Sequence, residues 1–442
     1  MLVLVSALSL GVRAYRLGDP CESPCTTAAE HVLMFDESYY VNAAQVIAGI
    51  RPQPGEVFGV AYQDAPPGTD PNAEHPQGGK LLIAAAIELF GDGPFAWRIG
   101  SLLFGSLAII GMYALVRSAG GGPWSAVGAA TLMAADNLMI VSGRMAMLDV
   151  YALAPMVWAV ALYLRGRIIP AAVLLAVADC MKEVSVYALL VLGLLELGRV
   201  LLRARDTGLP AEWAWRPALR RLAIAVLGSV ALVIAGLWVM GLIATPYAAP
   251  PFGPPPVGGR LLITGGPFDH LSYVIGFASS FTSPGGLAPA ASYPWQWLLD
   301  LKPIRFSSVY PTPPPGPHAI HPASSFLAMV SPPIIALAIP ALVVCVVRVL
   351  RRRPAADIGI PLLAVAWFAG MWVPFELQSA LASRITYLYY MVAVLPGIYL
   401  AITHLVSLLW RRRHMWLRGV VAVWGLAVLA AAVVLFPFVA IF

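Results

Sequence analysis

The stretch FAWRIGSLLFGSLAIIGMYALVR, residues 95–117, decides the fold of this chain. A helix rises about 1.5 Å per residue, so about 20 such residues cross the roughly 30 Å hydrocarbon core of a bilayer. Similar apolar runs recur along all 442 residues, and the mean hydropathy of +0.79 is too high for a soluble globular protein. We therefore predict an all-α, polytopic membrane protein.

Eleven apolar runs are candidate transmembrane helices, and the run at 168–181 is the shortest internal one. Two further segments, 37–50 and 80–90, are apolar on one face but too short to span, so we expect interfacial helices there. We detect no soluble domain and no internal repeat, and predict one transmembrane domain over 1–442. The predicted spans are 1–17, 95–117, 123–141, 145–164, 168–181, 184–202, 218–245, 325–348, 358–376, 385–409 and 416–441.

The placement of arginines predicts the orientation. The net charge is +6, and most basic residues lie in short loops between apolar runs, as the positive-inside rule expects of cytoplasmic loops. This pattern argues against a nucleic-acid partner. A cytoplasmic N-terminus in the plasma membrane puts two long loops outside, 18–94 and the Pro/Gly-rich 246–324. The predicted inner loops are 118–122, 165–167, 203–217, 349–357 and 410–415.

The four cysteines fall into two groups. Cys180 and Cys345 lie in apolar runs and are interpreted as small hydrophobic residues. Cys21 and Cys25 flank CESPC in the first outer loop, where an oxidising compartment would favour a disulfide. The apolar N-terminus lacks a basic region and a small-residue cleavage site, so it is interpreted as a first membrane helix, not a cleaved signal peptide.

Polar residues that the positive-inside rule does not explain gather on the predicted outer side. Ionisable groups at a membrane boundary are energetically costly and indicate function. Their convergence from distant segments is a stronger signal than any one residue. The candidate site residues are Asp36, Glu37, His75, Lys80, Arg98, Arg144, Asp149, Lys182, Arg384 and Tyr387.

Most of these candidates also have a structural explanation. Asp36 could cap the helix that follows it, and Glu37 could complement the helix dipole. Lys80 and Lys182 could be snorkelling lysines at the membrane interface, and Arg98 could be an interfacial anchor. The remaining structural roles are an ion pair for Arg144 with Asp149, and an aromatic belt for Tyr387 with its neighbouring tyrosines.

Several catalytic motifs are absent from the sequence. QGGKL lacks the first glycine and the Ser/Thr of a phosphate-binding P-loop. No Asp-x-Asp, Gly-x-Ser-x-Gly or zinc signature occurs. We therefore predict no metal ligands and no defined cofactor, and a requirement for a divalent metal stays open.

Four segments, in order, resemble the protein O-mannosyltransferases, membrane glycosyltransferases of the GT-C class. They are FDESYYVNAA, HPQGGKLLIA, WRIGSLLFGSL and GRMAMLDVYAL. YPWQWLLDLKPI and SRITYLYYMVAVLPGIYLA are similar to the bacterial members, which lack the β-trefoil insert. The resemblance covers nearly the whole chain and agrees with about eleven transmembrane helices and two long outer loops.

The resemblance implies an inverting transfer of a mannose-type sugar from a polyprenyl-phosphate carrier to Ser/Thr hydroxyls of secreted proteins on the outer membrane face. It also implies that Asp36 is the base. The His, Gly and Lys of the family's His-Pro-x-x-Gly-Lys pattern correspond to His75, Gly79 and Lys80 in this sequence. The chain departs from the family at HPQGGK, where HPPLGK is usual. It also departs at Lys182-Glu183, where Lys-Trp is frequent.

The chemistry assigns roles to the remaining candidates. The leaving phosphate needs cations, which Arg98, Lys182, Arg384 and Lys80 could supply, and Glu37 would orient the acceptor or Arg144. The alternative is a GT-C transferase that uses another sugar, such as aminoarabinose or arabinose, or a lipid or glycan acceptor. A transporter would favour paired repeats and charges near the bilayer centre, and a scaffold would not need this cluster.

Overall fold

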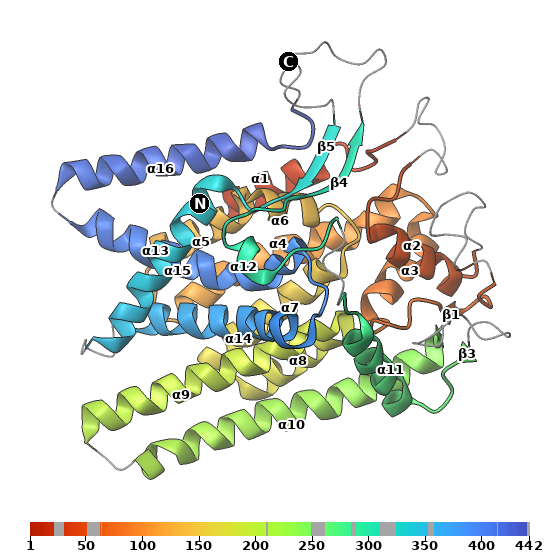
Figure 1. Cartoon of the computed structure of the whole chain (residues 1–442), viewed down its shortest axis with the longest axis horizontal. Helices are drawn as coiled ribbons and strands as arrows, with labels where there is room; N and C mark the ends of the chain where they lie inside the picture. Colours follow the sequence, from red (N-terminus) through yellow and green to blue (C-terminus); the bar gives the residue numbers. More distant parts are fainter. Residues whose placement is uncertain are drawn as a thin grey trace.

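The computed structural model describes residues 1–21, 31–50, 62, 64–208, 211–248, 261–283, 289–309, 324–351, 358–412 and 414–439. This part of the chain is a bundle of long helices (Figure 1). The helices are α1 (Leu2–Ala14), α2 (Glu37–Ile47), α3 (Gly78–Phe90), α4 (Pro94–Ser118), α5 (Pro123–Ala135), α6 (Asn137–Ser142), α7 (Leu148–Leu164), α8 (Ile168–Met181), η3 (Glu183–Val186), α9 (Tyr187–Thr207), α10 (Ala211–Ile243), α11 (Pro267–Ser280), α12 (Pro294–Trp297), α13 (Pro332–Leu350), α14 (Gly359–Ala382), η5 (Leu388–Tyr390), α15 (Met391–Arg411) and α16 (Met415–Val434).

The strands are short and lie in the connections between helices. A small sheet pairs β1 (Thr69–Asp70) in parallel with β2 (Thr245–Ala248), which pairs antiparallel with β3 (Leu261–Leu262). A separate hairpin-like pair joins β4 (Ile304–Val309) to β5 (Ser324–Ala328). Because β1 belongs to the first predicted outer loop and β2 to the second, the small sheet ties the two loops together.

Each predicted apolar run contains a helix, and the prediction of a multi-pass, all-α membrane protein is confirmed. Among the described residues, 7 helices are long and apolar enough to cross a membrane. The helices α1, α7 and α8 are apolar but shorter. The total of eleven spans, and the division of the chain into loops, stay predictions.

Two runs differ from their predicted form. The run 123–141 breaks at Asp136, which has extended backbone and whose carboxylate accepts a hydrogen bond from the Leu138 N–H over 3.1 Å, so that α6 begins as a separate helix. The run 325–348 begins as strand β5, and its helix starts only at Pro332. Proline suits the first turn of a helix because its missing N–H has no partner there.

Helices α7 and α15 form the centre of the bundle. Nearly every side chain from Leu148 to Tyr163 is buried, and so is the first half of α15. By contrast, α10 and α16 expose large apolar side chains, such as Leu227 and Leu426. These exposed faces fit hydrocarbon, since lipid tails solvate apolar groups as a protein core does. Cys180 and Cys345 are buried free thiols, as predicted, whereas Cys25 of the predicted disulfide lies outside the described residues.

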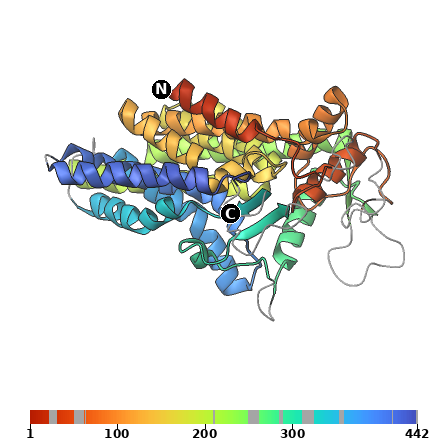
Figure 2. The same cartoon turned by 90° about the horizontal axis from the view of Figure 1, so that it is seen from above.

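The two ends of the bundle differ. Helices α2, α3 and α11 gather at one end, and the C-terminal ends of α9 and α15 lie at the other (Figure 1), while α2, α3 and α11 also lie together at one end in Figure 2. Arg205 and Arg411 lie at that second end, in the last turns of α9 and α15. The segments 37–50 and 80–90 do form helices, α2 and α3, and their depth relative to a membrane stays a prediction.

Candidate active site

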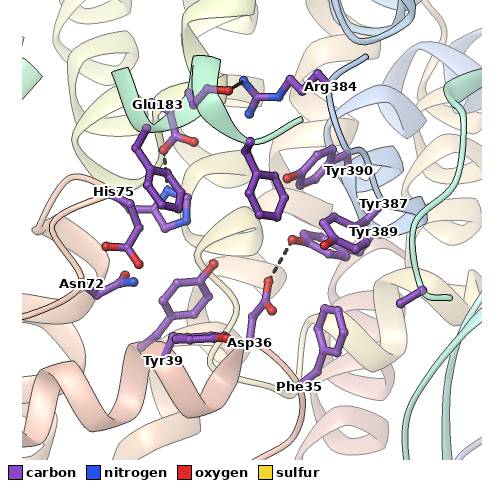
Figure 3. Close-up of a pocket in the computed structure, with 16 residues that line it drawn as sticks. Phe35, Asp36, Tyr39, Asn72, His75, Glu183, Arg384, Tyr387, Tyr389 and Tyr390 are labelled. Carbon is purple, nitrogen blue, oxygen red and sulfur yellow. Dashed lines mark hydrogen bonds and ion pairs between the residues drawn. The ribbon is translucent and has the colours of Figure 1, made fainter. Parts of the chain in front are cut away.

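A cavity of about 480 Å³ opens where the first outer loop, α11 and η5 meet. Four predicted site residues line it, namely Asp36, His75, Arg384 and Tyr387. Asp36 lies on one side, and Arg384 and Glu183 lie across from it (Figure 3). Much of the remaining wall is aromatic, formed by Phe35, Tyr39, Tyr40, Phe277, Phe281, Tyr389 and Tyr390. An apolar wall with a few convergent polar groups is typical of a ligand site.

Asp36 stands immediately before α2 at its N-cap position, but its side chain accepts no hydrogen bond from the helix backbone. Its Oδ2 accepts instead from the Tyr389 hydroxyl over 2.8 Å, so the interpretation of Asp36 as a helix cap is wrong. The preceding Phe35 has φ of 51°, a conformation that a bulky residue adopts only when its surroundings hold it. Its ring packs against Phe306 and Tyr389, with centroids 4.8 and 5.6 Å away, and this packing fixes Asp36 at the cavity.

Burial raises the pKa of Asp36 above its ordinary value. The positive charge of Lys182 and the hydrogen bond from Tyr389 oppose this rise without cancelling it. A carboxylate with a raised pKa accepts a proton more readily than an exposed aspartate does. Asp36 therefore remains the candidate for a general base at this cavity.

Glu37 faces away from the cavity and is fully buried against Arg98. Arg98 Nε and Nη2 donate to its two carboxylate oxygens, each over 2.8 Å. The backbone N–H groups of Met34 and Ala146 donate to the same carboxylate, each over 3.0 Å. With its oxygens occupied in this way, Glu37 anchors the start of α2. It pairs with Arg98 and not with Arg144, which was one of its two predicted partners beside the acceptor.

The remaining donors of Arg98 point to backbone carbonyls of the first outer loop. Nη1 donates to Leu17 O and Asp19 O over 2.6 and 2.9 Å, and Nη2 also donates to Val32 O over 3.1 Å. The guanidinium is completely buried. Every N–H of Arg98 thus has a protein partner, and this cation organises the loop that carries Asp36 instead of facing the cavity.

Lys80 is likewise buried below the cavity. Its Nζ lies 2.6 Å from Asp70 Oδ2, with both side chains completely buried, and donates to the backbone carbonyls of Asn72 and His75. These bonds hold the loop from Asp70 to His75 in place. Lys80 therefore positions His75 from behind and does not snorkel to an interface.

Asp149 and Lys182 form a buried ion pair behind the aromatic wall, with Lys182 Nζ 2.7 Å from Asp149 Oδ2. The ammonium also lies 5.3 Å from the centroid of the Tyr389 ring and 5.5 Å from that of Tyr390. A cation at this distance from an aromatic face is attracted by its quadrupole. The pair thus supports the tyrosine that contacts Asp36.

Arg144 lies outside the cavity, and the interpretation of an ion pair with Asp149 is wrong. Its Nη2 donates to the carbonyls of Tyr15 and Arg16, each over 2.8 Å, and its guanidinium lies 4.5 Å from the Phe438 ring centroid. Arg144 therefore joins the ends of the described chain near α1 and α16.

Arg384 is the guanidinium that lines the cavity. Its Nη1 donates to Ala278 O at the end of α11 over 2.8 Å, while Nε has no hydrogen-bond partner within the described residues. A bridge between Thr282 and Arg384 and the bond from Ile385 N to Phe281 O tie this segment to the second outer loop. Arg384 retains donors that a ligand can use.

Three residues at or behind the cavity were not among the predicted site residues, although Glu183 was noted as an acid near the carrier. Tyr389 was assigned only to an aromatic belt, although it is the partner of Asp36. Glu183 contacts His75, with Oε2 2.8 Å from Nδ1, and lines the cavity. Asp70 is the partner of Lys80. The departure from Lys-Trp to Lys182-Glu183 was a signal in the sequence that an acid stands near the site. Nothing in the sequence around Asp70 or Tyr389 indicated that they pair with Lys80 and Asp36.

Known proteins resemble this chain in sequence and in fold. A family model described as dolichyl-phosphate-mannose-protein mannosyltransferase matches residues 83–239. A polyprenol-phosphate-mannose–protein mannosyltransferase of Mycolicibacterium smegmatis is 25% identical over 459 aligned positions, which cover 91% of this chain and 80% of the relative. The structure of the S. cerevisiae protein O-mannosyltransferase Pmt1–Pmt2 complex bound to the sugar donor matches with a TM-score of 0.70 at 12% identity, covering 98% of this chain and 88% of that one.

The chain therefore resembles the protein O-mannosyltransferase family in sequence and in fold. The GT-C fold expected of this family is confirmed by the structural match. A second curated relative in the family, from Corynebacterium glutamicum, is 31% identical over 127 residues, which cover 27% of this chain and only 22% of that protein. The chain places its Asp-Glu pair in two different settings, with Asp36 at the cavity and Glu37 buried against Arg98.

Metal ligation was not predicted for this chain. Within the described ranges, no group of three or more His, Cys, Asp or Glu side chains is arranged to hold a metal ion. The cavity contains the carboxylates of Asp36, Glu74 and Glu183 and the imidazole of His75.

Proposed function

We propose that this protein is a polyprenyl-phosphate-mannose–protein mannosyltransferase, which moves a mannose-type sugar from a polyprenyl-phosphate carrier to Ser/Thr hydroxyls of secreted polypeptides. The observation that carries the proposal is the cavity that brings Asp36 opposite Arg384. It combines a base for a hydroxyl with a cation for a phosphate, which are the two groups that this transfer needs. The names of the relatives supply the sugar and the carrier.

The reaction is a displacement at the anomeric carbon. The acceptor oxygen attacks that carbon and forms the new glycosidic bond, while Asp36 takes the hydroxyl proton. The bond from the anomeric carbon to the phosphate oxygen breaks, and its electron pair leaves with the polyprenyl phosphate. Attack from the face opposite the leaving group inverts the anomeric centre, and Asp36 and Arg384 lie on opposite sides of the cavity as this geometry requires.

Arg384 is the group proposed to bind the leaving phosphate. Guanidinium donors of Arg384 other than the one bonded to Ala278 O can form charge-assisted hydrogen bonds that strengthen as the phosphate gains negative charge. Arg98 and Lys80 were candidates for this role, but their donors are directed to buried protein partners. Lys182 acts through the aromatic wall, where its charge supports Tyr389 and favours the ionised form of Asp36.

The aromatic wall suits the sugar and the lipid. Apolar faces of sugar rings pack on aromatic side chains, and Tyr387 and Tyr39 add hydroxyl groups at the cavity. The isoprenoid chain would extend between the spans into the bilayer. The proposed orientation keeps the N-terminus in the cytoplasm and the cavity on the outer face of the plasma membrane. The arginine-bearing connections at the opposite end of the bundle support it.

The experiment that tests the activity uses purified protein in detergent or liposomes with polyprenyl-phosphate mannose. A Ser/Thr-rich secreted peptide is compared with the same peptide in which every Ser and Thr is alanine, and with a lipid acceptor. Transfer to the hydroxyl peptide alone is expected. Transfer to the lipid acceptor alone, or from another sugar donor only, would replace the proposal with the GT-C alternative.

A further inference from the structure

His75 and Glu183 form a pair inside the cavity although they are 108 residues apart in the chain. The Nδ1 atom of His75 lies 2.8 Å from Glu183 Oε2, and the two side chains are 20% and 22% exposed. Both line the cavity with Arg384. None of the groups assigned above to proton transfer or phosphate binding explains why an acid stands at position 183.

The backbone is built to bring these two residues together. Gly78, at the start of α3, lies so close to the end of α8 that a Cβ on it would stand 2.5 Å from the carbonyl oxygen of Cys180. Only glycine permits this approach, which sets the loop before α3 against the beginning of η3. Lys80 also donates to the His75 carbonyl over 3.0 Å, so the backbone of His75 is fixed from behind.

The pair determines which imidazole nitrogen can meet a ligand. A carboxylate only accepts hydrogen bonds, so Nδ1 carries the hydrogen that points to Glu183. The Tyr40 ring stands edge-on to the imidazole with centroids 5.8 Å apart, which restricts its rotation. Nε2 is therefore the ring atom that remains for a substrate, in the manner of an imidazole oriented by a carboxylate in other enzymes.

We propose that Glu183 is a positioning residue that holds His75 so that Nε2 contacts the phosphate of the polyprenyl-phosphate sugar beside Arg384. Pairing with His75 occupies the Glu183 carboxylate, so an anionic ligand on this side meets the imidazole and Arg384 instead of an unpaired acid. The phosphate must lie across the anomeric carbon from Asp36, and Figure 3 shows Glu183 and Arg384 across the cavity from Asp36. The inference rests on the proposed function for the identity of the ligand.

The test is a double-mutant cycle on His75 and Glu183 with polyprenyl phosphate as the probe. Its inhibition constant against sugar transfer, and its direct binding to purified protein, are measured for His75→Ala, Glu183→Ala and the double variant. Loss of a hydrogen bond to a charged group predicts an affinity about ten-fold weaker for each single variant. The double variant should be no weaker than His75→Ala, because Glu183 acts only through His75.

Two further variants separate positioning from charge and from folding. Glu183→Gln keeps an acceptor for Nδ1–H and should retain most of the affinity. Glu74→Gln removes the same charge from the cavity lining and leaves the pair intact, so its effect measures charge alone. If Glu183→Ala fails to fold, Glu183→Leu, which fills the space but cannot accept the Nδ1 hydrogen, takes its place in the cycle, and the same loss of affinity is expected.

The outcomes distinguish this inference from the proposed function. Suppose that the wild type transfers sugar, but the affinity losses of the two single variants add up in the double variant. Removal of Glu183 then weakens binding equally with and without His75, and Glu183 does not act through His75. If the wild type binds polyprenyl phosphate and shows the predicted coupling but transfers no sugar to Ser/Thr peptides, the proposed acceptor is wrong and the positioning role stands.

Discussion

Tyr389 donates its hydroxyl hydrogen to Asp36 Oδ2 over 2.8 Å, which joins residues 353 positions apart in the chain. The contact brings the predicted base at the start of α2 against η5, the turn that precedes the central helix α15. Lys182 lies on the other side of the Tyr389 ring, paired with Asp149. Asp36 is therefore positioned by the bundle core as well as by its own loop.

Tyr389→Phe should lower kcat and move the acid limb of the pH–rate profile to higher pH. Asp36 works as a base only when ionised, so activity is lost as the pH falls through its pKa. Burial raises that pKa and the Tyr389 hydrogen bond lowers it, so removing the hydroxyl raises it further. Loss of one hydrogen bond to a charged group predicts about a ten-fold decrease in kcat. An unchanged acid limb in this variant would remove Asp36 as the group that titrates there.

Arg384→Gln should raise the KM for the polyprenyl-phosphate sugar by about ten-fold or more, since a charge-assisted bond to phosphate is lost. Arg384→Lys should recover part of the loss, because it keeps the charge but not the planar fork of donors. Arg220→Gln is the control, since Arg220 is an exposed arginine near the beginning of α10. Equal effects of the glutamine variants at 384 and 220 would contradict the role of Arg384.

Arg98→Ala should destabilise the protein by about 3–5 kcal/mol, because it leaves the Glu37 carboxylate buried without its cation. Thermal unfolding in detergent measures the effect, and Arg220→Ala is the control. Arg384→Gln should leave the unfolding temperature nearly unchanged, since that residue faces the cavity. If the Arg98→Ala protein is as stable as the wild type but has a raised KM for the sugar donor, Arg98 binds the phosphate and its structural role is contradicted.

Gly78→Ala should weaken the fold by about 1–3 kcal/mol and reduce transfer, because the new methyl group would press on the Cys180 carbonyl and separate His75 from Glu183. Gly128→Ala is the matched control, since a Cβ there meets nothing within 4 Å and alanine favours a helix. Unfolding temperature and donor KM are measured for both. Normal activity in Gly78→Ala would show that this close approach is not needed.

The sequence was sufficient to predict the helical bundle. Crossing hydrocarbon demands long apolar helices, and this demand leaves runs such as 95–117 that are visible without any tertiary information. The same reasoning predicted that Asp36, His75 and Arg384 would converge on one site, because ionisable groups at a membrane boundary are energetically costly and indicate function. It erred at Asp136, where one polar residue divides a run into two helices.

The partners of the buried charges could not be predicted. Arg98 and Arg384 look alike in sequence, yet Arg98 meets Glu37 and three loop carbonyls while Arg384 keeps donors for a ligand. The difference depends on how the first outer loop folds over α4, which no local pattern records. For the same reason the predicted pairing of Arg144 with Asp149 was wrong. Arg144 is nearer to Asp149 in sequence, but Lys182 is the residue that pairs with Asp149 in the folded protein.

The role of Asp36 as the base is best tested by sugar transfer in Asp36→Asn, a change that keeps the shape of the side chain and removes its ability to accept a proton. Purified variant and wild type are compared for transfer from polyprenyl-phosphate mannose to a Ser/Thr peptide, with polyprenyl-phosphate binding and thermal unfolding measured on the same samples. We expect normal folding, retained carrier binding and a loss of kcat of about 100-fold or more. Transfer at the wild-type rate by a folded Asp36→Asn protein would show that another group accepts the proton.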